Sequence, residues 1–309
     1  MKKKLIVFTL ALSIVALYRL PPIHQSQNYH HFANQTEYGE IPNFWNIISN
    51  VGFLLVAAAG WPRQIARWRE PWRRACFQTL LIGTALTAFG SAYYHAQPSD
   101  TRLVWDRLPM TIVFMCVLTF TIEEQLDPLL ARRLFVPLLT VGLLSVIYWR
   151  FSGDLRPYIL VQFYPLILIP VLLSFSKSEG ATSLAAQWGM IACYVLAKAA
   201  EMVDGRVAIP AGAHAWKHMA AAVGLLLYTQ SISNHSAATL WGLQAADRLP
   251  KRGQTTLLAT PSKRNQLVEQ SRTYTLDGIY YRRYNHAVER SSCERIRAGV
   301  SEALATGSG

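Results

Sequence analysis

The stretch LFVPLLTVGLLSVIYWRFSGDLRPYILVQFYPLILIPVLLSF, from Leu134 to Phe175, decides the fold class. It holds two apolar blocks, 134–149 and 157–175, joined by a short polar loop. A membrane-spanning helix needs roughly 17–25 predominantly apolar residues, and both blocks are about that long. The prolines inside them are tolerated in membranes, where neighbouring helices satisfy the freed backbone groups. The stretch therefore predicts two consecutive membrane helices.

Six more apolar blocks of similar length lie on either side of this pair. They span 5–20, 44–61, 77–94, 108–126, 184–200 and 212–232. Hydrophobic residues make up 51% of the 309-residue chain and charged residues only 16%, which is apolar-rich for a soluble protein. We therefore predict an all-α polytopic membrane protein of about eight helices.

The formal charge of +12 does not indicate a nucleic-acid partner, because Lys and Arg lie mostly in short loops and in the tail. A cytoplasmic excess of basic residues is what orients membrane proteins. With both termini in the cytoplasm, the cytoplasmic loops are the more basic ones. Their basic residues are Arg63, Arg67, Arg69, Arg73, Arg74, Arg132, Arg133 and Lys177. The opposite loops hold Arg102, Arg107, Arg150, Arg156 and Arg206.

The two ends of the chain differ from its centre. The segment 1–27 carries three lysines and then the first apolar block. It lacks a small-x-small cleavage site, so an uncleaved anchor is favoured over a removed signal peptide. From 233 to 309 long apolar blocks are absent, and the composition predicts a flexible, basic cytoplasmic tail. The four cysteines show no paired spacing, and no disulfide framework is expected.

Five polar residues occupy positions where apolar ones would be less costly. Ser91 and His95 are four residues apart near the end of one block, Asp106 precedes the next, and His214 and His218 open the last. Residues four apart share one face of a helix. The alternation of the blocks across the membrane brings all five residues to one depth on the outer side. They therefore form a candidate site.

Three histidines with an open fourth position are a catalytic zinc arrangement. Zinc acidifies a water molecule and polarises a carbonyl, Asp106 can move protons, and Ser91 can steady an oxyanion. Each part also has a simpler interpretation. The histidine pair can bridge polar groups at a membrane surface or relay protons in a transporter. Ser91 can serve helix packing, and Asp106 can cap a helix.

The pattern resembles a known family. The set S-x-x-x-H, then D eleven residues after that His, then H-x-x-x-H in the last helix, resembles the alkaline ceramidases and their wider hydrolase and receptor superfamily, in a bacterial-type form. FWNIISNVGF, Phe44–Phe53, also resembles that family's first core helix. The resemblance covers about 28–232 and implies a seven-helix core there, with the first block as an extra N-terminal helix.

The resemblance also implies an activity. It implies zinc on His95, His214 and His218, with Ser91 and Asp106 completing the site. It further implies hydrolysis of the N-acyl amide of ceramide-like lipids to a fatty acid and a long-chain base. The alternative within the superfamily is a non-catalytic metal-containing receptor or lipid-binding protein.

One part of the family pattern is missing. The ceramidases carry an acidic calcium site before and at the start of the first core helix, where this chain reads NYHHFANQTEYGEIPNFWN. The candidate ligands are Asn34, Glu37, Glu40 and Asn43. Hard cations prefer several charged oxygens, so the lack of a dense carboxylate cluster puts Ca²⁺ in doubt.

Overall fold

The computed structural model describes residues 2–64, 70–176 and 183–248. The chain divides into two units, Met1–Leu249 and Pro250–Gly309, and the second lies outside the described residues. Most of the tail predicted for 233–309 therefore lies there too.

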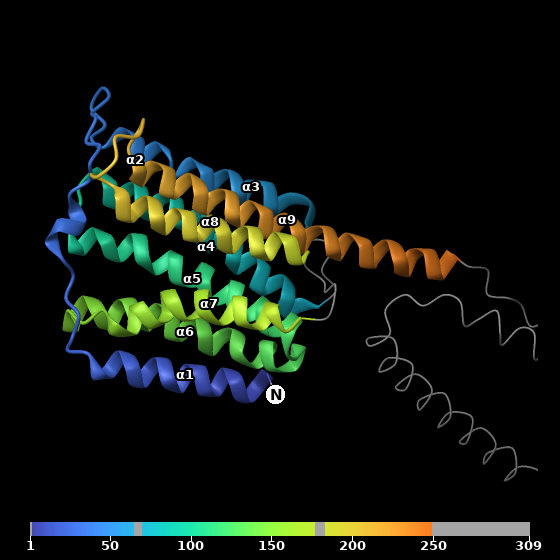
Figure 1. Cartoon of the computed structure of the whole chain (residues 1–309). Helices are drawn as coiled ribbons and strands as arrows, with labels where there is room; N and C mark the ends of the chain where they lie inside the picture. The colour runs from blue at the N-terminus through green and yellow to red at the C-terminus, as the bar shows by residue number, and fades with distance from the viewer. Residues whose placement is uncertain (1, 65–69, 177–182, 249–309) are drawn as a thin grey trace, which may run out of the picture. The chain divides into compact units, whose positions relative to one another are not determined.

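Helices account for nearly all regular structure in the described part of the chain (Figure 1). The helices are α1 (Lys2–Arg19), α2 (Phe44–Ile48), α3 (Val51–Gln64), α4 (Pro71–Ala96), α5 (Asp100–Gln125), α6 (Pro128–Ser152), α7 (Arg156–Ser174), α8 (Leu184–Val203) and α9 (Ala213–Arg248). A short 3₁₀ helix, Gln27–His30, lies between α1 and α2. Every predicted apolar block falls on a helix, with α2 and α3 sharing the block 44–61. The all-α prediction is confirmed, with α1 preceding the seven-helix core.

Five helical segments of the described chain are long and apolar enough to cross a membrane. They are Phe44–Trp61 and the helices α4, α5, α6 and α7. The protein is therefore a multi-pass membrane protein. Helix α1 contributes a shorter apolar segment, Ile6–Arg19. Helices α8 and α9 do not belong to this group; the charged pair Lys198 and Glu201 lowers the hydropathy of α8.

Short connections make successive helices antiparallel neighbours. Ser99 caps α5 by accepting a hydrogen bond from the Arg102 backbone N–H, at 3.3 Å. Asp127 does the same for α6 with the N–H of Leu130, at 2.9 Å. Side-chain caps of this kind satisfy amides that have no partner within the helix. The tight turn between α4 and α5 brings the end of α4 beside the start of α5.

Gly90 allows α4 and α5 to approach more closely than any side chain would permit. A Cβ atom at this position would lie 2.0 Å from the carbonyl oxygen of Trp105. Because α4 and α5 are in contact here, the residue after Gly90, Ser91, lies next to the residue after Trp105, Asp106. The close approach thus positions two of the predicted site residues.

The chain between α1 and α2, residues 20–43, crosses one end of the bundle (Figure 1). We call this segment the strap. It is tied to the α6–α7 loop, where Asp154 accepts from the backbone N–H of Ile23 at 3.3 Å and pairs with Arg156 at 2.8 Å. Hydrogen bonds from Arg156 lower the pKa of Asp154. Further along the strap, Phe32 is buried against Tyr94 of α4. The strap therefore covers the end of the bundle where the histidines lie.

Candidate metal centre

Three buried histidines meet beneath the strap. His95 comes from the last turn of α4, and His214 and His218 come from the first turns of α9. Their possible ligand nitrogens all lie within 4.8 Å of one another. The ring centroids are 4.8 Å apart for His95 and His214, and 5.0 Å apart for each of the other two pairs. The predicted triad is therefore brought together from helices distant in sequence.

The hydrogen bonding of these rings fits a bound cation. The Nδ1 atom of His95 and the Nε2 atom of His214 are buried and have no hydrogen-bond partner. A buried polar atom without a partner costs free energy, and a metal ion would remove that cost. The Nδ1 atom of His218 lies 2.9 Å from the Ser49 hydroxyl, so Nε2 of that ring is left to ligate. Such an outer hydrogen bond orients a metal ligand.

Ser91 and Asp106 lie together beside the triad. Ser91 is buried one turn before His95, and its hydroxyl is within hydrogen-bonding reach of the Asp106 carboxylate. Both residues line a cavity of about 260 Å³ that His218 also lines. The structure thus brings all five predicted residues to one place.

Two residues of the strap make contacts with the triad that were not predicted. The ring of Phe32 lies 4.6 Å from that of His95 and 4.5 Å from that of His214. The Asn43 side-chain amide donates to the backbone carbonyl of His95 at 2.9 Å. Because Phe32 lies in a non-helical segment, no periodic pattern marked it in the sequence. These contacts shield the triad at the end of the bundle.

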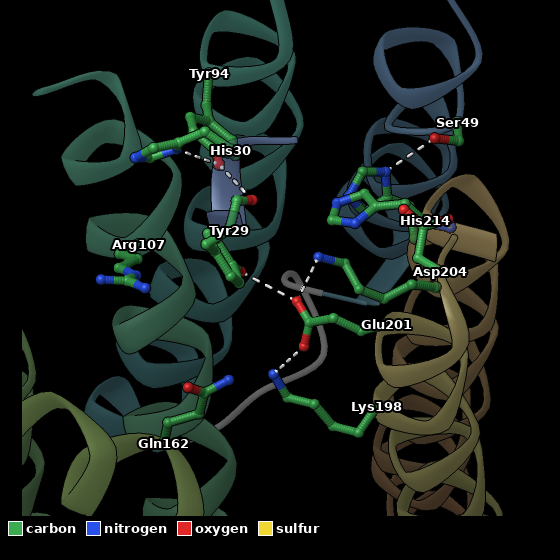
Figure 2. Close-up of polar contacts among 12 residues, drawn as sticks. Tyr29, His30, Ser49, Tyr94, Arg107, Gln162, Lys198, Glu201, Asp204 and His214 are labelled. Atoms are coloured by element: carbon green, nitrogen blue, oxygen red, sulfur yellow. Dashed lines mark hydrogen bonds and ion pairs between the residues drawn. The ribbon is translucent and has the colours of Figure 1, made fainter. Parts of the chain in front are cut away.

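A network of charged side chains lies next to the histidines (Figure 2). The carboxylate of Glu201 on α8 forms ion pairs with the Nζ atoms of Lys198, at 2.6 Å, and of Lys217 on α9, at 3.0 Å. The Tyr29 hydroxyl of the strap also donates to Glu201 at 3.0 Å. Burial raises the pKa of Tyr29, so its hydroxyl keeps its proton and acts as a donor. No sequence pattern marked Lys217 or Tyr29.

Asp204, which follows the last residue of α8, has a different role. Its carboxylate accepts the backbone N–H groups of His214, at 3.3 Å, and Ala33, at 3.1 Å. It therefore ties the start of α9 to the strap. The position of His214 depends on this contact between α8, α9 and the strap.

The cavity has a polar end and an apolar remainder. Its polar end holds Ser91, Asp106, Tyr29 and Glu201. Away from them the walls are hydrocarbon, contributed by Val113, Phe114, Val117, Leu166, Ile169 and Leu225. A polar group beside a long apolar wall matches the shape of a lipid with its reactive group near the head.

The segment in which the sequence put a calcium site in doubt has other contacts. Glu37 and Glu40 are exposed, and the side-chain oxygen of Asn34 accepts from the backbone N–H of Thr36 at 3.1 Å. Asn43 is engaged with His95, as above. Among the described residues, the histidine triad is the group of His, Cys, Asp or Glu side chains close enough to share a metal.

A family model described as Ceramidase matches residues 27–179. No curated protein matches the chain. The matched range contains Ser91, His95 and Asp106, whereas His214 and His218 lie beyond it. The fold supplies the missing half of the site by packing α9 against α4 through the triad.

Proposed function

Because the chain belongs to the ceramidase family, we propose that it is a zinc-dependent membrane amidohydrolase that cleaves the N-acyl amide of ceramide-like lipids. The products are a fatty acid and a long-chain base. One observation carries the proposal: three buried histidines meet, two of them with an unpartnered nitrogen, and the third, His218, lines a cavity together with Ser91 and Asp106. The alternative without catalysis, a metal-containing receptor or lipid-binding protein, would need the cavity and the metal but not Asp106.

His95, His214 and His218 are proposed to hold the metal. Zn²⁺ bound there would supply Lewis acidity, which polarises an amide carbonyl and acidifies water. Ser49 fixes the ring of His218 through the 2.9 Å contact. Phe32, between two of the rings, limits the access of bulk water from the strap side.

Asp106 is proposed as the proton carrier. As a carboxylate it accepts a proton from the water that attacks the amide carbon, and as an acid it delivers that proton to the leaving nitrogen. The C–N bond breaks, the acyl carbon gains the hydroxyl, and the amine gains the proton. Ser91, in reach of Asp106, orients this carboxylate and can donate to the developing oxyanion. The apolar wall of the cavity holds the acyl chain.

The test is hydrolysis by the purified full-length protein. Zinc-loaded protein in detergent is given N-acyl and ester lipids, and mass spectrometry measures free fatty acid and long-chain base. We expect equal amounts of both products from ceramide, and none after chelation of the metal. If zinc-loaded protein is inert on every amide and ester lipid tested, the hydrolase proposal is wrong and the receptor or lipid-binding alternative takes its place.

We also propose that both termini are cytoplasmic and that the metal centre lies toward the opposite face. The basic residues between α3 and α4 and at the start of α6 support this orientation. A reporter fused after Arg74 should then be cytoplasmic, and one inserted near Asp100 should lie on the other side. Reporter activities with the opposite assignment would reverse the proposed orientation.

A further inference from the structure

Arg107 is a buried cation that the proposed reaction does not use. It follows Asp106 on α5 and its side chain is buried. One guanidinium nitrogen, Nη2, donates to the Gln25 side chain of the strap at 2.7 Å. The other, Nη1, is buried without any hydrogen-bond partner. In the described part of the chain, no carboxylate lies within ion-pair distance of Arg107.

Aromatic rings surround the guanidinium. Its central carbon lies 4.3 Å from the ring centroid of Trp149 and 4.7 Å from that of Tyr158. Cation–π contacts compensate part of the cost of burying a charge, but they supply no acceptor in line with Nη1. Anchoring the strap through Gln25 requires Nη2 alone. A purely structural role therefore leaves Nη1 unexplained.

Arg107 lines the same cavity as Ser91, Asp106 and His218. Two further cations line it, Lys198 and Lys217. Glu201 is shared between both lysines. With Arg107, Lys198 and Lys217 set against Asp106 and Glu201, the lining has an excess of positive charge before any metal is bound. Unbalanced charge inside a membrane is costly, and a ligand of opposite charge would offset it.

We propose that Arg107 and Lys198 form an anion subsite in this cavity, so that the preferred lipid carries a phosphate, sulfonate or carboxylate group on its head. Figure 2 places Arg107, Gln162 and Lys198 on three different helices, α5, α7 and α8, and all three side chains line the cavity. Arginine suits this role because its planar fork binds such oxyanions with two parallel hydrogen bonds. That this lipid is a substrate, and not only a ligand, rests on the proposed function.

The carboxylate of a released fatty acid is a second source of the same chemistry. The two sources predict different ligands for the subsite. A head-group anion would make an anionic N-acyl lipid bind more tightly than its neutral counterpart. A product carboxylate would make a free fatty acid the tight ligand and leave the two N-acyl lipids equal.

The experiment measures binding, which does not depend on turnover. Full-length zinc-loaded protein carrying Asp106→Asn is placed in phosphatidylcholine nanodiscs. Ceramide 1-phosphate, ceramide of the same chain lengths and palmitate then compete for a fluorescent lipid. We expect ceramide 1-phosphate to bind about tenfold or more tightly than ceramide, as for a hydrogen bond to a charged group. Arg107→Gln should reduce the preference to about threefold or less.

Matched variants separate the subsite from general damage. Lys198→Gln should reduce the preference independently of Arg107, and Arg107→Lys should keep part of it because the charge remains. Arg150→Gln, at an exposed arginine of α6, should leave the preference unchanged. Equal binding of the two N-acyl lipids, with palmitate no tighter, would overturn the proposal. So would an Arg107→Gln variant that folds and weakens both lipids equally. Tight palmitate binding lost in Arg107→Gln would keep the subsite and assign it to the product.

Hydrolysis of the same two lipids by protein with Asp106 intact separates this proposal from the previous one. If the protein cleaves ceramide but binds anionic and neutral lipids equally, the amidohydrolase proposal is supported and the anion-subsite proposal is wrong. If the protein binds the anionic lipid more tightly but cleaves neither lipid, the anion-subsite proposal is supported and the hydrolase proposal is wrong.

Discussion

Two helix pairs of different character contribute to the metal centre. Helices α4 and α5 are both apolar enough to span a membrane, lie within the range matched by the family model, and carry Ser91, His95 and Asp106. Helices α8 and α9 lie beyond that range and carry His214 and His218 beside the Lys198, Lys217 and Glu201 network. The difference indicates a division of labour. In the proposed function the first pair holds the proton-transfer residues, and the second adds two metal ligands and most of the charge.

The largest expected effect tests whether both pairs are needed for the metal. Replacing His95, His214 or His218 singly with Ala should remove zinc and reduce hydrolysis to background, because three ligands leave little redundancy. Elemental analysis after dialysis measures the zinc content. His31→Ala, at an exposed histidine of the strap, is the matched control and should retain the metal. If His95→Ala keeps stoichiometric zinc, the metal is bound by α9 without α4, and the two helix pairs do not share the metal centre.

The next effect tests whether the chemistry belongs to α4 and α5. Asp106→Asn keeps the shape of the side chain but cannot carry the proton, so turnover should fall on the order of 10²–10⁴-fold. Ser91→Ala removes one donor and should cost about 10–10³-fold. Zinc content and thermal unfolding should stay near those of the unmutated protein in both variants. Loss of zinc in Asp106→Asn would instead make Asp106 part of the metal-binding group.

The sequence predicted the first pair better than the second. The apolar blocks of α4 and α5 are long, and the four-residue spacing of Ser91 and His95 places them on one helix face, as the same spacing does for His214 and His218. In α8 the apolar pattern is weaker, and the Lys217 side chain stands in the midst of the H-x-x-x-H motif. Its pairing with Glu201 depends on how α8 packs against α9, which no local pattern encodes. Phe32, Tyr29 and Ser49 were missed for the same reason, since each meets the site through the fold.

A smaller effect concerns the charge network of α8 and α9. Glu201→Gln leaves Lys198 and Lys217 without their shared carboxylate. Removing one partner of a buried ion pair is strongly destabilising, but these side chains are 17–26% exposed. We therefore expect a loss of about 1–3 kcal/mol in unfolding free energy. Chemical denaturation in detergent measures it, and Glu37→Gln, at an exposed glutamate, is the control. An unchanged free energy of unfolding would show that the network does not stabilise the fold and that its charges serve only the cavity.

The smallest effect lies outside both pairs, where Asp154 joins the strap to the α6–α7 loop. The pKa of Asp154 is lowered in the folded protein by hydrogen bonds from Arg156. A carboxyl group with a lowered folded pKa stabilises the fold above its unfolded pKa, about 3.9. That contribution is lost as the pH falls through the folded pKa. Asp154→Asn should therefore unfold about 1–3 °C lower from about pH 5 upward.

As the pH falls below about 4, the unfolding temperatures of Asp154→Asn and the unmutated protein should approach each other. They should meet once the pH is below the lowered folded pKa, where the carboxyl group is protonated in both the folded and the unfolded protein. Thermal unfolding from about pH 2 to about pH 7 measures this difference in unfolding temperature. Glu40→Gln, at an exposed strap residue, is the control for removing a charge. A temperature difference that persists unchanged at low pH would mean that the substitution does not act through the charge of Asp154, since the Asn amide oxygen can still accept from the backbone N–H of Ile23. The attachment of the strap would then be independent of the ion pair, and the strap could cover the histidines without any charged contact to the α6–α7 loop.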